Sequence, residues 1–230
     1  MRATGQDTQH APVRITISKE NYLKAIAEAE SEGETVIAAT LTRWLNVSAP
    51  AVTMAIKRLK RDELIHVEPD GRIALTQGGR KIANRILFRH HLIERMLTEI
   101  FGMEWYKVHD EAEQLEHAVS ADFERLLIEK LGSEGDCPHG NQFGLDSPEE
   151  RRRRGWHPLD EADAGATVTV VSVFERDRQL LEYLDGLGLR PGVSVEIVSR
   201  NYDETLTLRL DDRLLQLGHP VARKVWITAA

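Results

Sequence analysis

The residues of this chain best suited to chemistry are Glu113, Glu116 and His117. On a helix, side chains three and four positions apart share a face, so both carboxylates and the imidazole converge. His90 and Glu94 stand four apart on the helical pattern that precedes them. If the two helices pack antiparallel, His90 meets the Glu113 face. Imidazoles mixed with carboxylates predict a site for a divalent first-row metal, and the carboxylate share favours Mn(II) or Fe(II) over Zn(II) or Cu(I). A solvated Glu/His helix face is the alternative.

A second candidate site centres on Cys137 and His139, which a turn through Pro138 can direct to one side. Glu94 and an acidic residue of the C-terminal strands, such as Asp177, would complete it. A Cys-x-His pair is also compatible with an incidental loop. His109 lies two helical turns before His117 and is a further candidate ligand.

An enzymatic reading has less support from these residues. A zinc peptidase needs H-E-x-x-H or H-x-x-E-H to place two imidazoles and a general base. Glu113 stands where the first histidine of the second motif would be. A Mn/Fe-dependent hydrolase built on the same side chains stays open as an alternative, but we find no nucleophile or phosphate-binding loop. We therefore predict that the chain is not an enzyme and has no small-molecule substrate.

The N-terminal third has the pattern of a winged helix-turn-helix. A helix capped by Ser18 runs to Gly33, a second spans 35–45, and a third begins near Pro50, which suits a first helical turn. Two short strands about the turn 68–71 then form a hairpin. This order predicts DNA binding through the third helix, with a small helical bundle as the alternative.

The third helix and the hairpin carry the predicted DNA contacts. Residues expected to face bases open the helix: Ser48, Pro50, Ala51, Thr53 and Met54. Residues expected to contact phosphates are basic: Lys57, Lys60, Arg61 and, on the wing, Arg72. Charge supports this division, because residues 35–80 hold seven basic and four acidic residues, whereas 91–160 hold eight and sixteen. A metal-independent winged-helix DNA binder is a further alternative.

The rest of the chain changes from helical to strand patterns. Helices are predicted over 80–100, 105–119 and 121–131, and alternating strands after Gly165 suggest a small SH3-like β-barrel. The predicted fold is α+β and multidomain. Its expected parts are a disordered leader (1–17), a winged helix-turn-helix (18–78), a helical metal-binding and dimerisation domain (79–150), a linker (151–165) and an SH3-like, FeoA-like domain (166–230).

Composition is that of a globular protein, with 41% hydrophobic and 29% charged residues. No apolar run approaches the roughly 20 residues that a membrane span needs. The one cysteine excludes an intramolecular disulfide and fits a reducing compartment. We expect a cytoplasmic protein without a membrane partner.

Four stretches resemble the diphtheria-toxin-repressor and manganese-transport-regulator family: residues 20–23, 89–95, 107–117 and 188–192. The resemblance covers nearly the whole chain and is most specific in the second and third stretches. It implies a homodimeric transcription regulator that binds a palindromic double-stranded DNA operator and represses metal-uptake genes. Metal would fix the two winged helices at a spacing that fits successive major grooves.

The resemblance also implies ligand sets. The primary site would use His90, Glu113, Glu116, His117 and, on the first helix, Asn21. The second site would use Glu94, Cys137, His139 and Asp177, with His109 as the corresponding ligand in iron-type members. A glutamate at Glu113 is similar to manganese-type members, which favours Mn(II) while Fe(II) stays possible; Zn(II), Cd(II) or Co(II) are expected to substitute in vitro. Lys24, where some manganese regulators have a glutamate, argues against a binuclear centre of that design.

Overall fold

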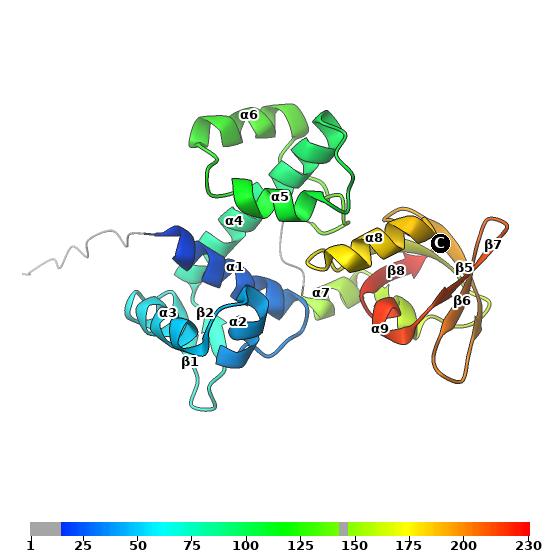
Figure 1. The fold of residues 1–230 in the computed structure, drawn as a ribbon, viewed down its shortest axis with the longest axis horizontal. Helices are drawn as coiled ribbons and strands as arrows, with labels where there is room; N and C mark the ends of the chain where they lie inside the picture. The colour runs from blue at the N-terminus through cyan, green and yellow to red at the C-terminus, as the bar shows by residue number, and fades with distance from the viewer. Residues whose placement is uncertain (1–14, 143–146) are drawn as a thin grey trace, which may run out of the picture.

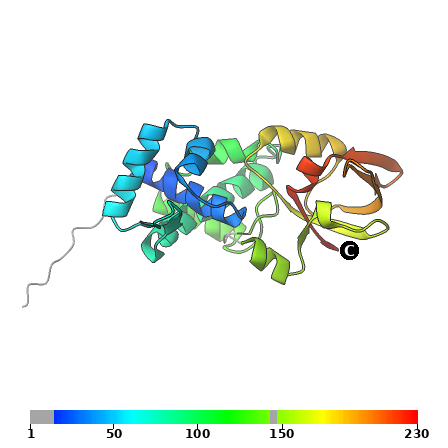
Figure 2. The ribbon, with the colours of Figure 1, turned by 90° about the horizontal axis from the view of Figure 1, so that it is seen from below.

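A computed structural model describes residues 15–142 and 147–230, and these form three lobes (Figures 1 and 2). Of the predicted leader, residues 1–14 lie outside the described part. The N-terminal lobe carries helices and a hairpin, the middle lobe is helical, and the C-terminal lobe is built on a sheet. The predicted α+β multidomain organisation is confirmed.

The N-terminal lobe is a winged helix-turn-helix. It contains α1 (Ile17–Ser31), α2 (Ala38–Leu45), α3 (Ala49–Arg61) and the antiparallel hairpin β1 (Ile65–Val67) and β2 (Ile73–Leu75). The residue that caps α1 is Thr16 rather than Ser18; its hydroxyl accepts from the backbone N–H of Lys19. Asn46 ends α2 with φ of 50°, a left-handed conformation that asparagine tolerates, and so allows the tight turn into α3.

One long helix joins the N-terminal and middle lobes. α4 (Gln77–Arg95) starts beside the hairpin and continues as a π-helical turn, Met96–Ile100. α5 (Val108–Leu115) is shorter than the predicted 105–119, whereas α6 (Ala121–Leu131) has its predicted bounds. α5 packs beside the C-terminal half of α4, which brings the two predicted ligand-bearing helices together (Figure 1).

The C-terminal lobe is an antiparallel six-stranded sheet in the order β3 (His157–Pro158), β8 (Val225–Ala229), β4 (Thr167–Val173), β5 (Ser194–Arg200), β6 (Leu206–Leu210) and β7 (Arg213–Leu217). The predicted strands correspond to β4 (Thr167–Val173), β5 (Ser194–Arg200), β6 (Leu206–Leu210) and β8 (Val225–Ala229). Three further elements complete the sheet and its cover: α8 (Arg178–Leu187), β7 (Arg213–Leu217) and α9 (His219–Ala222).

The stretch predicted as a linker contains regular structure. α7 (Pro148–Arg153) begins with a capping box between Ser147 and Glu150, and it is followed by β3 (His157–Pro158) and the 3₁₀ turn Leu159–Glu161. The buried guanidinium of Arg151 contacts Glu32, the C-cap residue of α1, at 3.2 Å and lies over the Trp226 ring of the sheet. α7 therefore connects the N-terminal and C-terminal lobes.

The C-terminal lobe is also joined to the middle lobe through Trp105. Trp105 belongs to the hydrophobic core of the sheet, and its indole N–H donates to Asp185 on α8 at 2.6 Å. Within the described residues, no helix is long and apolar enough to cross a membrane. The three lobes thus meet around the end of α4, where the candidate ligands lie.

Candidate metal centre and DNA-binding surface

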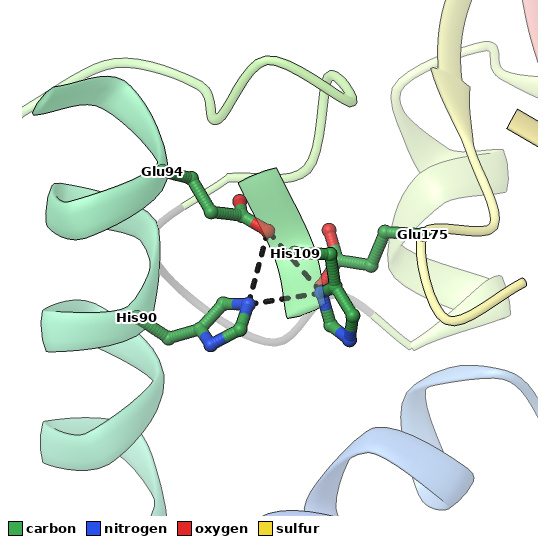
Figure 3. Close-up of side chains that lie close together, drawn as sticks. All are labelled: His90, Glu94, His109 and Glu175. Carbon is green, nitrogen blue, oxygen red and sulfur yellow. Dashed lines mark hydrogen bonds and ion pairs between the residues drawn. The ribbon is translucent and has the colours of Figure 1, made fainter. Parts of the chain in front are cut away.

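A buried cluster of imidazoles and carboxylates forms where the three lobes meet. Figure 3 shows His90 and Glu94 projecting from α4, His109 from α5, and Glu175 from the loop between β4 and α8. His90 Nε2 lies 3.0 Å from Glu94 Oε1 and 2.9 Å from His109 Nδ1. His109 Nδ1 lies 3.2 Å from Glu94 Oε1 and 3.9 Å from Glu175 Oε1. All four side chains are buried, so their ligand atoms surround one point shielded from solvent.

A second group of donors shares the same two carboxylates. His91, Cys137, Glu94 and Glu175 also offer atoms within one ion's reach. The Cys137 thiol donates to Glu175 Oε2 at 3.4 Å. His139 Nδ1 lies 3.4 Å from Glu94 Oε1 and 3.5 Å from Glu175 Oε2. The predicted second set therefore comes together, except for its acid from the barrel.

The loop that carries Cys137 and His139 is held against the sheet. His139 Nε2–H donates to the Trp105 carbonyl at 2.9 Å, which turns Nδ1 toward the carboxylates, as in the outer-shell hydrogen bonds of metal-bound histidines. Gly140 has φ of +82°, and a Cβ there would lie 1.9 Å from the Val171 carbonyl oxygen. Only glycine allows the loop to approach β4 this closely.

The electrostatics of this cluster fit a cation. Burial would raise the pKa of Glu94, but the neighbouring His139 and His90 hold that pKa well below its usual range. Burial disfavours protonated His139, yet Glu94 and Glu175 outweigh it and raise the pKa of His139 to about 10. Glu94 Oε2 is buried and has no hydrogen-bond partner among the described residues. Burying a carboxylate oxygen without a partner costs free energy. A divalent metal ion would provide that partner, and it suits a donor set of carboxylates and imidazoles.

The predicted primary set is arranged around a lysine. Lys24 on α1 is buried, and its Nζ lies 2.7 Å from Glu116 Oε2, 3.0 Å from His90 Nδ1 and 3.7 Å from Glu113 Oε1. Burial disfavours the ammonium, but the carboxylates of Glu28 and Glu116 outweigh burial and raise the pKa of Lys24. The ammonium therefore stands where the sequence reading expects a metal ion.

The remaining primary-site candidates surround the same place. Asn21, Glu113, Glu116 and His117 line one pocket together with Lys24. His117 Nδ1 lies 2.8 Å from Glu20 Oε2, and Nε2 lies 3.5 Å from Glu116 Oε1. With Lys24 among these carboxylates, the arrangement does not fit a metal ion bound between His90, Glu113 and Glu116. Glu116 instead accepts a hydrogen bond from His90 Nδ1 at 2.7 Å.

The structure does not bring Asp177 into the buried cluster. Its carboxylate caps α8 by accepting from Leu180 N at 3.0 Å and pairs with Lys224 Nζ at 2.9 Å. The barrel contributes Glu175 instead, two residues earlier. Sequence reasoning missed Glu175 and His91, although a helix-capping assignment of Asp177 would have left Glu175 as the available acid.

The predicted DNA-binding residues are accessible to solvent on α3 and in the hairpin turn. Ser48 caps α3 by accepting from Ala51 N, and the side chains expected to contact DNA are all exposed: Ser48, Pro50, Ala51, Thr53, Met54, Lys57, Lys60, Arg61 and Arg72. Arg61 pairs with Asp62 and Arg72 with Asp70. Arg58, which the sequence reading left out, is also exposed and donates to the Met54 carbonyl at 3.3 Å.

Family models match the three lobes in turn. Residues 14–73 match the N-terminal DNA-binding domain of iron-dependent repressors, and residues 76–143 match their metal-binding and dimerisation domain. Residues 157–229 match the FeoA domain, which confirms the predicted FeoA-like C-terminal part. The matched descriptions give the chain a DNA-binding part and a metal-binding part that dimerises.

Two relatives are similar to this chain over most of its length. The diphtheria toxin repressor of Corynebacterium glutamicum is 34% identical over 189 residues, covering 78% of this chain and 83% of the relative. The iron-dependent repressor IdeR of Mycobacterium tuberculosis is 34% identical over 173 residues, covering 73% of each. Both are repressors by name, which agrees with the prediction of a regulator rather than an enzyme.

Solved structures share the overall fold of this chain. A manganese-dependent transcriptional repressor in complex with manganese is 28% identical with a TM-score of 0.82, covering 92% of this chain and all of that one. The manganese regulator SloR is 26% identical with a TM-score of 0.77, covering 94% of this chain and all of that one. The chain belongs to the diphtheria toxin repressor family of metal-dependent, DNA-binding transcription regulators.

Proposed function

We propose that this chain is a cytoplasmic, homodimeric repressor of metal-uptake genes that is activated by Mn(II), with Fe(II) as the second candidate. The observation that carries the proposal is the buried pair of carboxylates, Glu94 and Glu175, with imidazoles and one thiol around it. Carboxylates and imidazoles suit Mn(II) and Fe(II). Relatives are named for both metals, IdeR for iron and SloR for manganese.

The ligands that we propose come from the helical middle lobe, from the loop that follows α6 and from the C-terminal lobe. Glu94 and Glu175 would supply the charge, and the neutral or thiolate donors would be His90, His91, His109, Cys137 and His139. A bound divalent ion would replace the protons that His90 and His139 hold beside the two carboxylates. Zn(II), Cd(II) and Co(II) are expected to bind in vitro, since affinities of such sites rise along the first-row series; the relative ScaR has been solved with Zn²⁺ and with Cd²⁺.

The residues of the predicted primary set take a supporting role in this proposal. Glu116 accepts from His90 Nδ1–H, which leaves Nε2 to face Glu94 and His109. A carboxylate in that position fixes the tautomer and the orientation of a ligating histidine. Because Glu116 also contacts Lys24 on α1, the centre is connected to the DNA-binding domain by hydrogen bonds.

DNA recognition would follow the helix-turn-helix mode. The N-terminal residues of α3, from Ser48 to Met54, would reach base edges in the major groove, while Lys57, Lys60 and Arg61 would hold phosphates and Arg72 the adjacent backbone. Two protomers would then read two half-sites of a palindrome. Metal acts through differential affinity, since only one arrangement of the two winged helices fits the operator.

The test is a selection of DNA ligands from random duplexes by the full-length protein, with Mn(II), Fe(II) under anaerobic conditions, Zn(II) or chelator. Enrichment of an inverted repeat only with metal, followed by a metal-dependent gel shift, supports the proposal. Equal enrichment in chelator would favour a metal-independent DNA binder. Glu94→Gln should lose the metal response, while the exposed Glu99→Gln on the following turn should keep it. Titration with each metal then separates Mn(II) from Fe(II).

A further inference from the structure

Three consecutive residues after β4 connect the metal centre to the DNA-binding domain. Glu175 lies in the buried cluster. The ring of Phe174 packs edge-on against Trp44 of α2, with centroids 6.3 Å apart. Arg176 extends toward α1 and α2. Any ligand that fixes Glu175 therefore also restricts the two neighbours that touch the N-terminal lobe.

The Arg176 side chain makes polar contacts with both of the other lobes. Nη1 donates to Glu28 Oε2 on α1 at 2.6 Å and to Glu113 Oε1 on α5 at 3.3 Å. Nη2 donates to the Trp44 carbonyl at 3.2 Å, and the guanidinium lies 5.0 Å from the centre of the Trp44 ring. Only 18% of the side chain is exposed. One arginine of the C-terminal lobe thus contacts both other lobes.

These contacts are directional. A guanidinium has a planar set of donors and also stacks on aromatic rings, so it fixes the angle between its partners better than a lysine does. Trp44 and Glu28 belong to two different helices of the same domain. Because Arg176 contacts both Glu28 and Trp44, it restricts the rotation of the N-terminal domain as well as the distance of that domain from the sheet.

We propose that Arg176 is the positioning residue through which occupancy of the metal centre reaches the DNA-binding domain. Metal held by Glu175 orders the loop and presents Arg176 to Glu28 and Trp44, which favours one orientation of the winged helix. Without metal, the loop is held less firmly and the domain samples more orientations. The C-terminal domain is then a transmitter between metal and DNA. This inference rests on the proposed metal-dependent DNA binding.

The experiment compares Arg176→Ala with Arg178→Ala in the full-length protein. Arg178 lies in the same segment and carries the same charge, but it forms ion pairs with Asp110 and Glu182, which lie outside the N-terminal lobe. For each variant, the affinity for the selected duplex is measured in Mn(II) and in chelator. The ratio of the two affinities should fall about tenfold in Arg176→Ala, within the usual range of allosteric coupling, and stay unchanged in Arg178→Ala.

If Arg176 only stabilised the packing of the lobes and did not transmit metal occupancy, the result would differ. Arg176→Ala would then weaken DNA binding equally with and without Mn(II), leaving the ratio intact, and that outcome would overturn the inference. A wild type whose ratio is one would instead overturn the proposed function. Arg176→Lys should restore the ratio only in part, because the ammonium cannot reproduce the stacked, forked contacts.

Two further measurements keep the inference falsifiable if Arg176→Ala folds poorly. Glu28→Gln removes the same ion pair from the other side and should lower the ratio similarly, with little additional fall in the double variant. Hydrogen exchange reports on the DNA-binding domain directly: Mn(II) should protect amides of α1 and α2 in the wild type and in Arg178→Ala, and much less in Glu28→Gln. Equal metal-induced protection in all three proteins would contradict the role of Arg176.

Discussion

The two sides of the His90 ring offer the same kinds of side chain but opposite electrostatics. At Nδ1, Glu116 and Glu113 face the ammonium of Lys24. At Nε2, Glu94 and Glu175 face only imidazoles as ion-pair partners within the described residues. The first group contains a fixed ammonium, whereas the positive charge in the second comes from imidazole protons that a metal ion can displace. Spacing of carboxylates and histidines identifies places where a cation belongs, whereas the presence of a lysine decides whether that cation is a metal.

The largest expected effect comes from removing the internal cation. Lys24→Met leaves Glu113 and Glu116 without their ammonium, and breaking a buried ion pair costs about 3–5 kcal/mol. Urea unfolding of the metal-free variant should show this loss, while the exposed Lys81→Met should change stability by less than about 0.5 kcal/mol. If Mn(II) restored the full stability of Lys24→Met, the Nδ1 side would also be able to take a metal.

Removing a carboxylate from the other side should abolish the metal response. Glu94→Gln keeps the shape of the side chain but removes its charge. Loss of a residue that only orients a ligand lowers metal affinity by up to about 100-fold, so loss of the ligand Glu94 should lower Mn(II) affinity by about 100-fold or more. Equilibrium dialysis measures the Mn(II) affinity of each variant. Asp177→Asn, which changes the acid at the start of α8, should retain wild-type affinity. The comparison fails if Asp177→Asn loses metal and Glu94→Gln does not.

A change of pH should affect Mn(II) affinity and the stability of the metal-free protein in opposite directions. Burial and Lys24 disfavour protonated His90, but Glu94 and Glu116 raise its pKa to about 9, and the pKa of His139 is about 10. Metal must displace these protons, so Mn(II) affinity should rise from about pH 6.5 to about pH 8.5, about tenfold per unit for each proton released. Dialysis at several pH values and proton release into weak buffer measure this.

The same pKa shifts predict the opposite trend for metal-free stability. A pKa raised by folding stabilises the folded state below the unfolded value of about 6.5, and this stabilisation is lost as the pH rises toward the folded value. Chemical unfolding in chelator should therefore show the contribution of His90 and His139 declining above about pH 6.5. An Mn(II) affinity that does not change between about pH 6.5 and about pH 8.5 would show that metal binding does not displace the protons of His90 and His139.

The smallest effect concerns the DNA surface. Lys57→Ala should weaken binding to specific and unrelated duplexes alike and reduce the salt dependence of affinity by about one phosphate contact. Binding isotherms at several salt concentrations give this slope. Lys130→Ala on α6, remote in sequence from the DNA-binding domain, is the matched control. A change confined to one base position would instead make Lys57 a base-reading residue.

Much of the fold was accessible from sequence because periodic patterns and caps are local. The apolar periodicity of α1, the turn at Asn46 and the proline at the start of α3 together indicate a helix-turn-helix. The missing pieces are short: α7 spans six residues, and β7 pairs with β6 across a turn at Asp211, whose φ is 53°. An aspartate pair between alternating leucines was the available signal for that hairpin.

The site was accessible only in part, because its residues come from segments far apart in the sequence. Helical spacing related Glu94 to His90 and placed Glu113, Glu116 and His117 on one face. The spacing of residues 113–117 cannot indicate that α1 places Lys24 among these side chains, because that depends on how the lobes pack. Similarly, Asp177 and Glu175 are equally plausible acids until the start of α8 is known, after which Asp177 is needed as its cap.

The close approach of Gly140 to β4 has a consequence for truncated forms of this protein. The loop that presents Cys137 and His139 rests on the backbone of the first long strand, and the amide of Val173 donates to the His139 carbonyl at 2.9 Å. A fragment ending before the sheet would keep both side chains in its sequence yet lose the support that orients them. Dividing the gene between the helical and sheet domains therefore cuts through the sensor itself, and neither half should report metal as the intact chain does.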